Sequence, residues 1–179
     1  MRCMELAETI ESLRRTPQTL AALLTGVDPE WLRRADGPGT WSAYDIVGHL
    51  LNGDQTDWLP RVRMIMEYGA TRTFESVDRE AMLARAPEPP EVLLERLRAA
   101  RSANLEELAS LGITAEDLGR TGRHPAFGEV TLGQLIATWL AHDLTHVAQV
   151  AEVLAGRLRT DVGPWRAYLP ALDRTVAAE

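Results

Sequence analysis

The fold is decided by residues 131–156, which read TLGQLIATWLAHDLTHVAQVAEVLAG. Apolar residues recur there every three or four positions, as they do on the buried face of an α-helix: Leu135, Ile136, Trp139, Leu140, Val147, Val150 and Leu154. Thr131 and Gln134 form a capping-box pair at the start, and Gly156 is a typical helix stop. The stretch therefore predicts one long helix that packs against other helices.

Two histidines in this segment point in the same direction. His142 and His146 are four residues apart, which places them about 40° apart around a helix. Imidazoles with this spacing can bind one metal ion together. Thr138 and Gln149 fall on the same face and are candidate hydrogen-bond partners for the two rings. The alternative is a pair of core histidines without a metal.

Three further segments have helical periodicity, and we expect helices over residues 5–24, 42–68 and 91–111. Pro17 should kink or split the first helix, and Pro60 should bend the second. Ser42 with Asp45 three residues later predicts a capping pair at the start of the second helix.

The connections carry the prolines and glycines. Residues 69–90 form the longest connection, with a short helix possible over 78–85 and the run APEPP at its end. Residues 119–128 are expected to form a loop that contains His124, a surface residue. The tail from residue 161 to 179, with Trp165 and Tyr168, is expected to pack back as a short helix.

These elements predict an all-α protein. No period-two alternation, internal repeat or second domain is evident, so residues 1–179 are expected to form a single four-helix bundle domain. The long connection between the second and third helices leaves room for a crossover, and an up-down-up-down order is therefore not required.

Composition excludes several classes of protein. The 179 residues include 26 acidic and 19 basic residues, and every basic residue is Arg. The net charge of −7 argues against nucleic-acid binding. The absence of Lys excludes Schiff-base chemistry and a P-loop, and one Cys excludes an internal disulfide. No apolar run is long enough to cross a membrane, and the first residues turn acidic too soon for a signal peptide. We therefore expect a cytoplasmic protein.

The second helix supplies a third histidine. His49 lies one turn after Asp45, at the border between the polar and apolar faces of that helix. It is either a partly exposed surface residue or a third metal ligand from a facing helix. Three imidazoles on one ion leave a position open for water or substrate, which is the pattern of catalytic rather than structural sites.

Four stretches resemble one known family. Residues 40–50 (TWSAYDIVGHL), 127–135 (FGEVTLGQL), 142–150 (HDLTHVAQV) and 163–168 (GPWRAY) are similar, in this order, to the DinB-like (DinB/YfiT) superfamily. The resemblance implies a four-helix bundle of up-down-down-up topology with a long crossover between helices 2 and 3. It also implies a divalent metal, often nickel or zinc, held by His49, His142 and His146.

The resemblance also implies a range of functions. Some members of the superfamily are thiol S-transferases or isomerases that use a low-molecular-weight thiol, and others are named metal-dependent hydrolases. We therefore expect a metal-dependent hydrolase or thiol transferase that acts on a small molecule, as a homodimer. Asp45 is a candidate catalytic residue that orients His49 or acts as a base, unless it is only a helix cap.

Other classes compete with this hypothesis. The protein could be a non-catalytic stress or scaffold protein that binds a metal or a small molecule. A zinc-protease reading of His142-Asp143-x-x-His146 is disfavoured, because Asp is shorter than the required Glu and Arg166 stands where a third ligand would be expected. A di-iron bundle would need paired Glu-x-x-His motifs, and none occurs.

Overall fold

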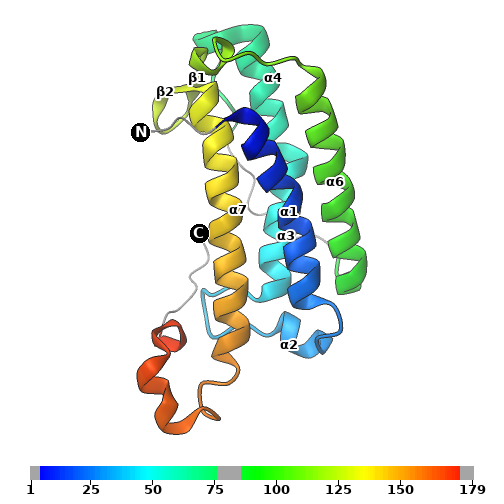
Figure 1. Ribbon diagram of the computed structural model, residues 1–179, viewed down its shortest axis with the longest axis vertical. Coiled ribbons are helices and arrows are strands. Elements are labelled where there is room, and N and C mark those ends of the chain that lie inside the picture. The colour runs from blue at the N-terminus through cyan, green and yellow to red at the C-terminus, as the bar shows by residue number, and fades with distance from the viewer. Residues whose placement is uncertain (1–4, 76–85, 174–179) are drawn as a thin grey trace.

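Four long helical segments lie side by side in the computed structural model, which describes residues 5–75 and 86–173 (Figure 1). They are α1 (Leu6–Leu24), α3 (Ala43–Thr56) continued by α4 (Trp58–Tyr68), α6 (Pro90–Ser110) and α7 (Leu132–Gly156). A short helix, α2 (Pro29–Arg33), joins α1 to α3. The predicted four-helix bundle is confirmed, and so is the capped start of α7 at Thr131.

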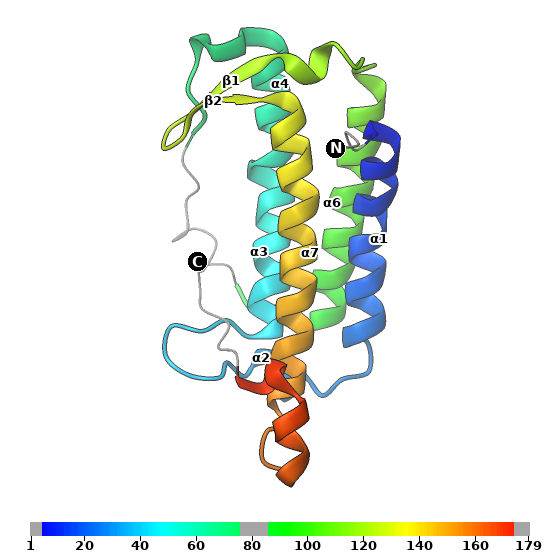
Figure 2. The same cartoon turned by 60° about the vertical axis from the view of Figure 1, so that its left-hand side comes forward.

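The order of the helices follows the predicted up-down-down-up topology. Helix α1 runs toward one end of the bundle, α3 and α6 both run back from it, and α7 returns in the direction of α1 (Figures 1 and 2). Because α4 ends and α6 begins at opposite ends, the connection between them spans the length of the bundle. The crossover is thus confirmed; the short helix expected over residues 78–85 lies outside the described residues.

Helix α1 is continuous through Pro17, so the predicted split of this helix does not occur. Pro17 is buried in the helix and has no N–H to donate to the carbonyl of Leu13, four residues earlier. That carbonyl instead accepts a 2.8 Å hydrogen bond from Nη1 of Arg101 on α6. A side chain from another helix thus replaces the bond that proline removes.

The second predicted helix is divided rather than only bent. Helix α3 ends at Thr56 and α4 begins at Trp58, with Asp57 between them at φ −113° and ψ −66°. The ring of Pro60 clashes with the carbonyl four residues earlier, at Thr56, which places the break there. Pro60 then occupies the first turn of α4, where its missing N–H costs nothing.

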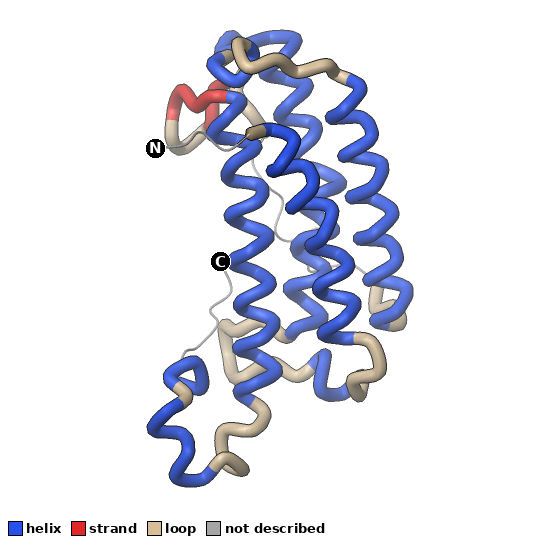
Figure 3. Tube along the Cα trace, in the orientation of Figure 1, coloured by secondary structure: helices blue, strands red, loops and turns tan. Residues whose placement is uncertain are grey.

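A short antiparallel hairpin replaces the loop expected over residues 119–128 (Figure 3). Strand β1 (Thr121–His124) pairs with β2 (Gly128–Thr131), and a 3-10 turn, η2 (Asp117–Gly119), precedes them. Strands of four residues are too short to reveal a period-two pattern in the sequence. Gly122 has no room for a side chain, because a Cβ there would lie 2.6 Å from Ile65 and 2.8 Å from Phe74.

The described part of the tail forms two 3-10 turns, η3 (Gly163–Tyr168) and η4 (Pro170–Asp173). Leu172 is buried, and its carbonyl accepts a hydrogen bond from Arg159. Trp165 and Tyr168, by contrast, are 69% and 84% exposed. The tail is helical as expected and docks through Leu172, but its aromatic residues do not pack on the bundle. A further 3-10 turn, η1 (Gly69–Thr71), follows α4.

The core consists of two apolar clusters with a polar layer between them. On α6, Leu93 and Leu97 belong to one cluster and Leu105 and Leu108 to the other, with buried Arg101 between them. In the other three long helical segments, buried polar residues likewise lie between residues of the two clusters. These polar residues are Thr16, Asp54, Asp143 and His146. Within residues 5–75 and 86–173, no helix is both long and apolar enough to cross a membrane.

Candidate metal centre

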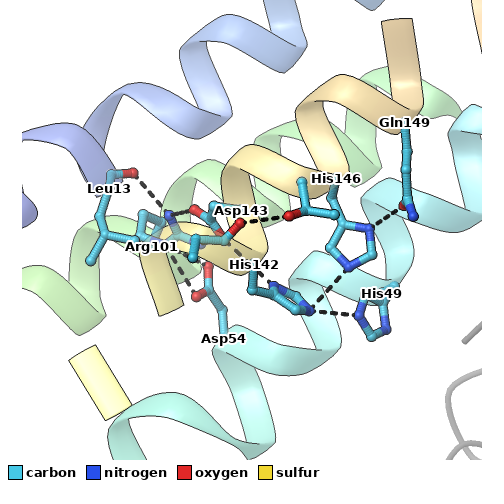
Figure 4. Close-up of polar contacts among 10 residues, drawn as sticks. Leu13, His49, Asp54, Arg101, His142, Asp143, His146 and Gln149 are labelled. Carbon is cyan, nitrogen blue, oxygen red and sulfur yellow. Dashed lines mark hydrogen bonds and ion pairs between the residues drawn. The ribbon is translucent and has the colours of Figure 1, made fainter. Parts of the chain in front are cut away.

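Three histidines from two helices converge in the polar layer (Figure 4). Nε2 of His142 lies 2.9 Å from Nε2 of His49 and 3.1 Å from Nε2 of His146. One ring nitrogen of each lies within 4.8 Å of the others. Helix α3 supplies His49, and the i, i+4 spacing on α7 supplies the other two. The structure thus brings together the three histidines that the sequence singled out.

The two Nε2–Nε2 separations from His142 fit a shared cation. Nitrogen ligands about 2.0–2.1 Å from one ion lie about 3 Å apart when they subtend an angle near 90–100°. Nδ1 of His146 is 2.6 Å from Oε1 of Gln149 and donates to it, so the Nε2 of a neutral His146 ring carries a lone pair. Such lone pairs gathered at one point repel each other unless a cation or a proton lies between them. The predicted partner Gln149 therefore has the expected role, whereas Thr138 is exposed.

Two tryptophans pack against the imidazoles. The ring of Trp41 lies 4.7 Å from that of His49, and the ring of Trp58 meets His142 edge-on at 5.1 Å. Trp58 also stacks on Trp139 at 5.8 Å. His146 is 1% exposed and the side chain of His142 is 19% exposed, so the site is largely shielded from solvent. A low-dielectric wall of this kind strengthens electrostatic interactions inside the site.

Directly behind His142 lies a buried ion-pair network centred on Arg101 (Figure 4). Its Nη1 and Nη2 donate to the two carboxylate oxygens of Asp143, and its Nε lies 3.0 Å from Asp54 Oδ2. Nη1 also donates to the carbonyl of Leu13. The three charged side chains are at most 2% exposed. The guanidinium therefore connects α6 with α1, α3 and α7.

The two carboxylates differ in pKa. Burial raises the pKa of Asp54 to about 6, and repulsion from Asp143 adds to this, against the attraction of Arg101. Burial also acts to raise the pKa of Asp143, but the neighbouring His142 imidazole and the Arg101 guanidinium outweigh it and leave the value below the ordinary range. One cation between two acids thus favours ionisation of Asp143 over that of Asp54.

Sequence analysis missed this network, although a signal was present. Arg101 falls in the same stripe as the buried leucines of α6, at positions 94, 97, 105 and 108. Asp54 and Asp143 likewise occupy positions that helical periodicity assigns to the core. A charged residue inside an apolar stripe is almost never fully buried unless it is paired. Three such residues on three helices would have predicted their association.

Asp45 is engaged in the predicted helix cap. Its Oδ2 accepts hydrogen bonds from the backbone N and from Oγ of Ser42, at 2.9 and 2.6 Å. Oγ of Ser42 in turn accepts from the N–H of Asp45 at 3.2 Å, which completes the capping box. These bonds fix the first turn of α3 and so place His49, one turn later. A catalytic role for Asp45 stays a prediction.

Arginines near the tail, and His124 in the hairpin, form contacts away from the three histidines. Arg157 and Arg159 lie 3.7 and 3.8 Å from the carboxylate of Asp36, and Arg166 pairs with Asp173. His124 lies in β1, where its Nδ1 accepts from the backbone N–H groups of residues 126 and 127. It is not part of the three-histidine cluster.

The chain is thus a four-helix bundle whose second and fourth long helical segments bring three histidines together. These features can be compared with those of known proteins. The model of the DinB superfamily matches residues 12–150, and the chain belongs to that superfamily. It is 30% identical over 154 residues to a Geobacillus kaustophilus protein with the provisional name metal-dependent hydrolase GK0616. The match covers 83% of this chain and 84% of that protein.

Two solved structures have a similar fold. YfiT from Bacillus subtilis, described as a probable metal-dependent hydrolase with an unusual four-helix bundle topology, superposes with a TM-score of 0.72 at 18% identity, over 86% of this chain and 89% of YfiT. TT2238, a four-helix bundle protein, gives a TM-score of 0.53 at 20% identity, over 81% and 97% of the two chains. At these identities the likeness concerns the fold.

Proposed function

We propose that this protein is a metal-dependent hydrolase whose single divalent ion, nickel or zinc, is held by Nε2 of His49, His142 and His146. The observation that carries the proposal is the convergence of the three Nε2 atoms, at 2.9 and 3.1 Å. Imidazole nitrogens suit both metals. The names given to GK0616 and YfiT support hydrolysis as the reaction.

The chain's own residues prepare the site. Gln149 fixes the ring of His146, the capping box at Ser42 places His49, and Trp41 and Trp58 pack against the rings of His49 and His142. A divalent ion held by three neutral imidazoles lowers the pKa of a water or thiol bound to it, and so supplies a nucleophile near neutral pH. Asp45 is the candidate to accept a proton there.

The expected thiol transfer differs from hydrolysis only in the nucleophile. A low-molecular-weight thiol would replace water as the group that attacks a small electrophilic substrate. The chain has one Cys, at position 3, and no Lys. We therefore favour a thiol cosubstrate over a side chain of the protein as the nucleophile.

Homodimer formation stays a prediction, and sedimentation velocity checks it.

Metal content and turnover test the proposal together. The wild type should bind one nickel or zinc ion per chain, measured by elemental analysis, and hydrolyse at least one member of a panel of esters, amides and phosphoesters. His142→Ala should lose both properties, and His124→Ala should lose neither. Turnover that requires an added thiol would favour the transferase. Metal binding without any turnover would favour the non-catalytic alternative, and turnover that survives His142→Ala would exclude metal-assisted chemistry.

A further inference from the structure

The buried network behind His142 has a geometry that suits it to orient a metal ligand. We propose that Asp143, held in place by Arg101, is a positioning residue that keeps the proton of His142 on Nδ1 and directs its Nε2 lone pair toward His49 and His146. This inference rests on the metal site of the proposed function. It assigns a role to the layer of charge between the two apolar clusters.

The ring of His142 has a buried nitrogen that faces the carboxylate of Asp143. Its Nδ1 is buried and has no hydrogen-bond partner among the residues that the structure describes. Asp143 Oδ1 lies 4.0 Å away. A neutral imidazole that offers Nε2 to a cation must carry its proton on Nδ1. A carboxylate at this distance attracts an N–H and repels a bare nitrogen, and it therefore favours the tautomer that binds metal.

Several buried hydrogen bonds hold the carboxylate of Asp143 in this position. Arg101 donates to both oxygens of Asp143 through its two terminal nitrogens, which fixes the carboxylate in the plane of the guanidinium. The hydroxyl of Thr16 gives Asp143 a further hydrogen bond. Arg101 is held in turn by Asp54 at its Nε edge and by the Leu13 carbonyl. Asp143 therefore cannot turn away from His142 without breaking several buried bonds.

The buried network also carries a net negative charge. When all three groups are ionised, Asp54, Arg101 and Asp143 carry a net charge of about −1 in a region with little solvent. This charge partly offsets that of a divalent cation at the three imidazoles. Asp143 can therefore influence the metal site in two ways. It adds one negative charge to the layer, as Asp54 does, and its carboxylate lies close to His142, a contact that the structure records for Asp143.

Asp54 provides a matched control for Asp143. Both carboxylates are fully buried and both are bound to Arg101, and Asn substitution removes one negative charge from either. Zinc affinity would be measured by competition with a chelator for the wild type, Asp143→Asn and Asp54→Asn, at a pH above the pKa of Asp54. We expect Asp143→Asn to weaken binding about 10- to 100-fold, and Asp54→Asn to weaken it clearly less.

The outcomes are distinct. Equal losses in the two variants, or wild-type affinity in Asp143→Asn, would overturn the positioning role while leaving the metal site intact. A wild type that binds no metal would overturn the proposed function, and this inference with it. Urea unfolding of the metal-free variants checks that both are folded.

A second measurement needs no variant. In a crystal structure of the zinc-loaded wild type, we expect Nδ1 of His142 to donate to Asp143 Oδ1 at a distance of about 3 Å. Another acceptor on Nδ1 would overturn the inference even if Asp143→Asn failed to fold.

Discussion

Nε2 of His49 and Nε2 of His142 lie 2.9 Å apart, although 93 residues separate them along the chain. They come from helices α3 and α7, whose packing fixes the distance between them. The same packing places a tryptophan against each ring. The site therefore depends on the whole bundle rather than on a local motif, and its members can be tested one at a time.

Removal of His49 should abolish stabilisation by metal. An ion at about 100 times its dissociation constant stabilises a folded protein by about 2.7 kcal/mol. Zinc should therefore raise the Tm of the wild type and of His124→Ala, whose imidazole lies in the hairpin, but not that of His49→Ala. Differential scanning fluorimetry provides the measurement. An equal rise in all three proteins would show that the ion binds elsewhere.

Gln149 should influence metal affinity through His146. Its Oε1 accepts from Nδ1 of that ring at 2.6 Å. Gln149→Leu removes the acceptor and is expected to weaken zinc binding about 10- to 100-fold, since outer-shell partners have effects of this size. Gln149→Glu keeps an acceptor at nearly the same place and should retain affinity. Isothermal titration would contradict the assignment if the Leu variant bound zinc as tightly as the Glu variant.

Ser42 and Asp45 share a capping box, so their variants separate capping from catalysis. Ser42→Ala and Asp45→Asn should each lower the free energy of unfolding by about 1 kcal/mol. A catalytic Asp45 further predicts that Asp45→Asn lowers kcat about 100-fold or more, whereas Ser42→Ala, which affects only the placement of His49, lowers it much less. If the two variants had small and equal effects on kcat, Asp45 would act only as part of the helix cap.

Asp54 should make stability depend on pH. Its pKa is about 6 in the folded protein and near the ordinary value of 3.8 in the unfolded chain. The folded state therefore binds the proton more tightly, and the free energy of unfolding falls as pH rises from about 4 to about 6, by at most about 3 kcal/mol. Asp54→Asn cannot ionise and should lack this decrease. Urea unfolding across that range would refute the assignment if the curves of variant and wild type ran parallel.

Gly122 should tolerate no side chain. A Cβ at this position would lie 2.6 Å from Ile65 and 2.8 Å from Phe74, both in the core. Gly122→Ala is therefore expected to cost about 1–3 kcal/mol of stability, the usual range for overpacking. Gly119→Ala, in the nearby 3-10 turn, meets nothing within 4 Å and provides the control. Comparable chemical denaturation midpoints for the two variants would argue against a tight contact at Gly122.

Much of the fold was predictable from local patterns. Helical periodicity and the capping residues Ser42 and Thr131 located the long helices, since both signals arise from contacts within a few residues. The crossover followed from the length of one connection and from the family resemblance. The i, i+4 spacing of His142 and His146 indicated the metal site, because residues with this spacing lie on the same face of one helix.

The errors arose where distant contacts override local preference. Pro17 is accommodated because Arg101, 84 positions further along the chain, supplies the donor that the carbonyl of Leu13 lacks. The hairpin beside Gly122 depends on Ile65 and Phe74, which no periodic pattern links to it. In both places tertiary packing determined a structure that propensity alone could not.

Arg101 also has a consequence for which arrangement of helices the chain can adopt. Apolar side chains tolerate sliding, because one leucine can replace another in a neighbouring layer. The guanidinium of Arg101 does not tolerate sliding, because it must reach a carbonyl on α1 and carboxylates on α3 and α7. Sliding α3, α6 or α7 by one turn, about 5.4 Å, would leave a charge buried without its partner, at a cost of about 3–5 kcal/mol, and sliding α1 would take the carbonyl of Leu13 away from the guanidinium. A single side chain thus sets the vertical alignment of all four helices.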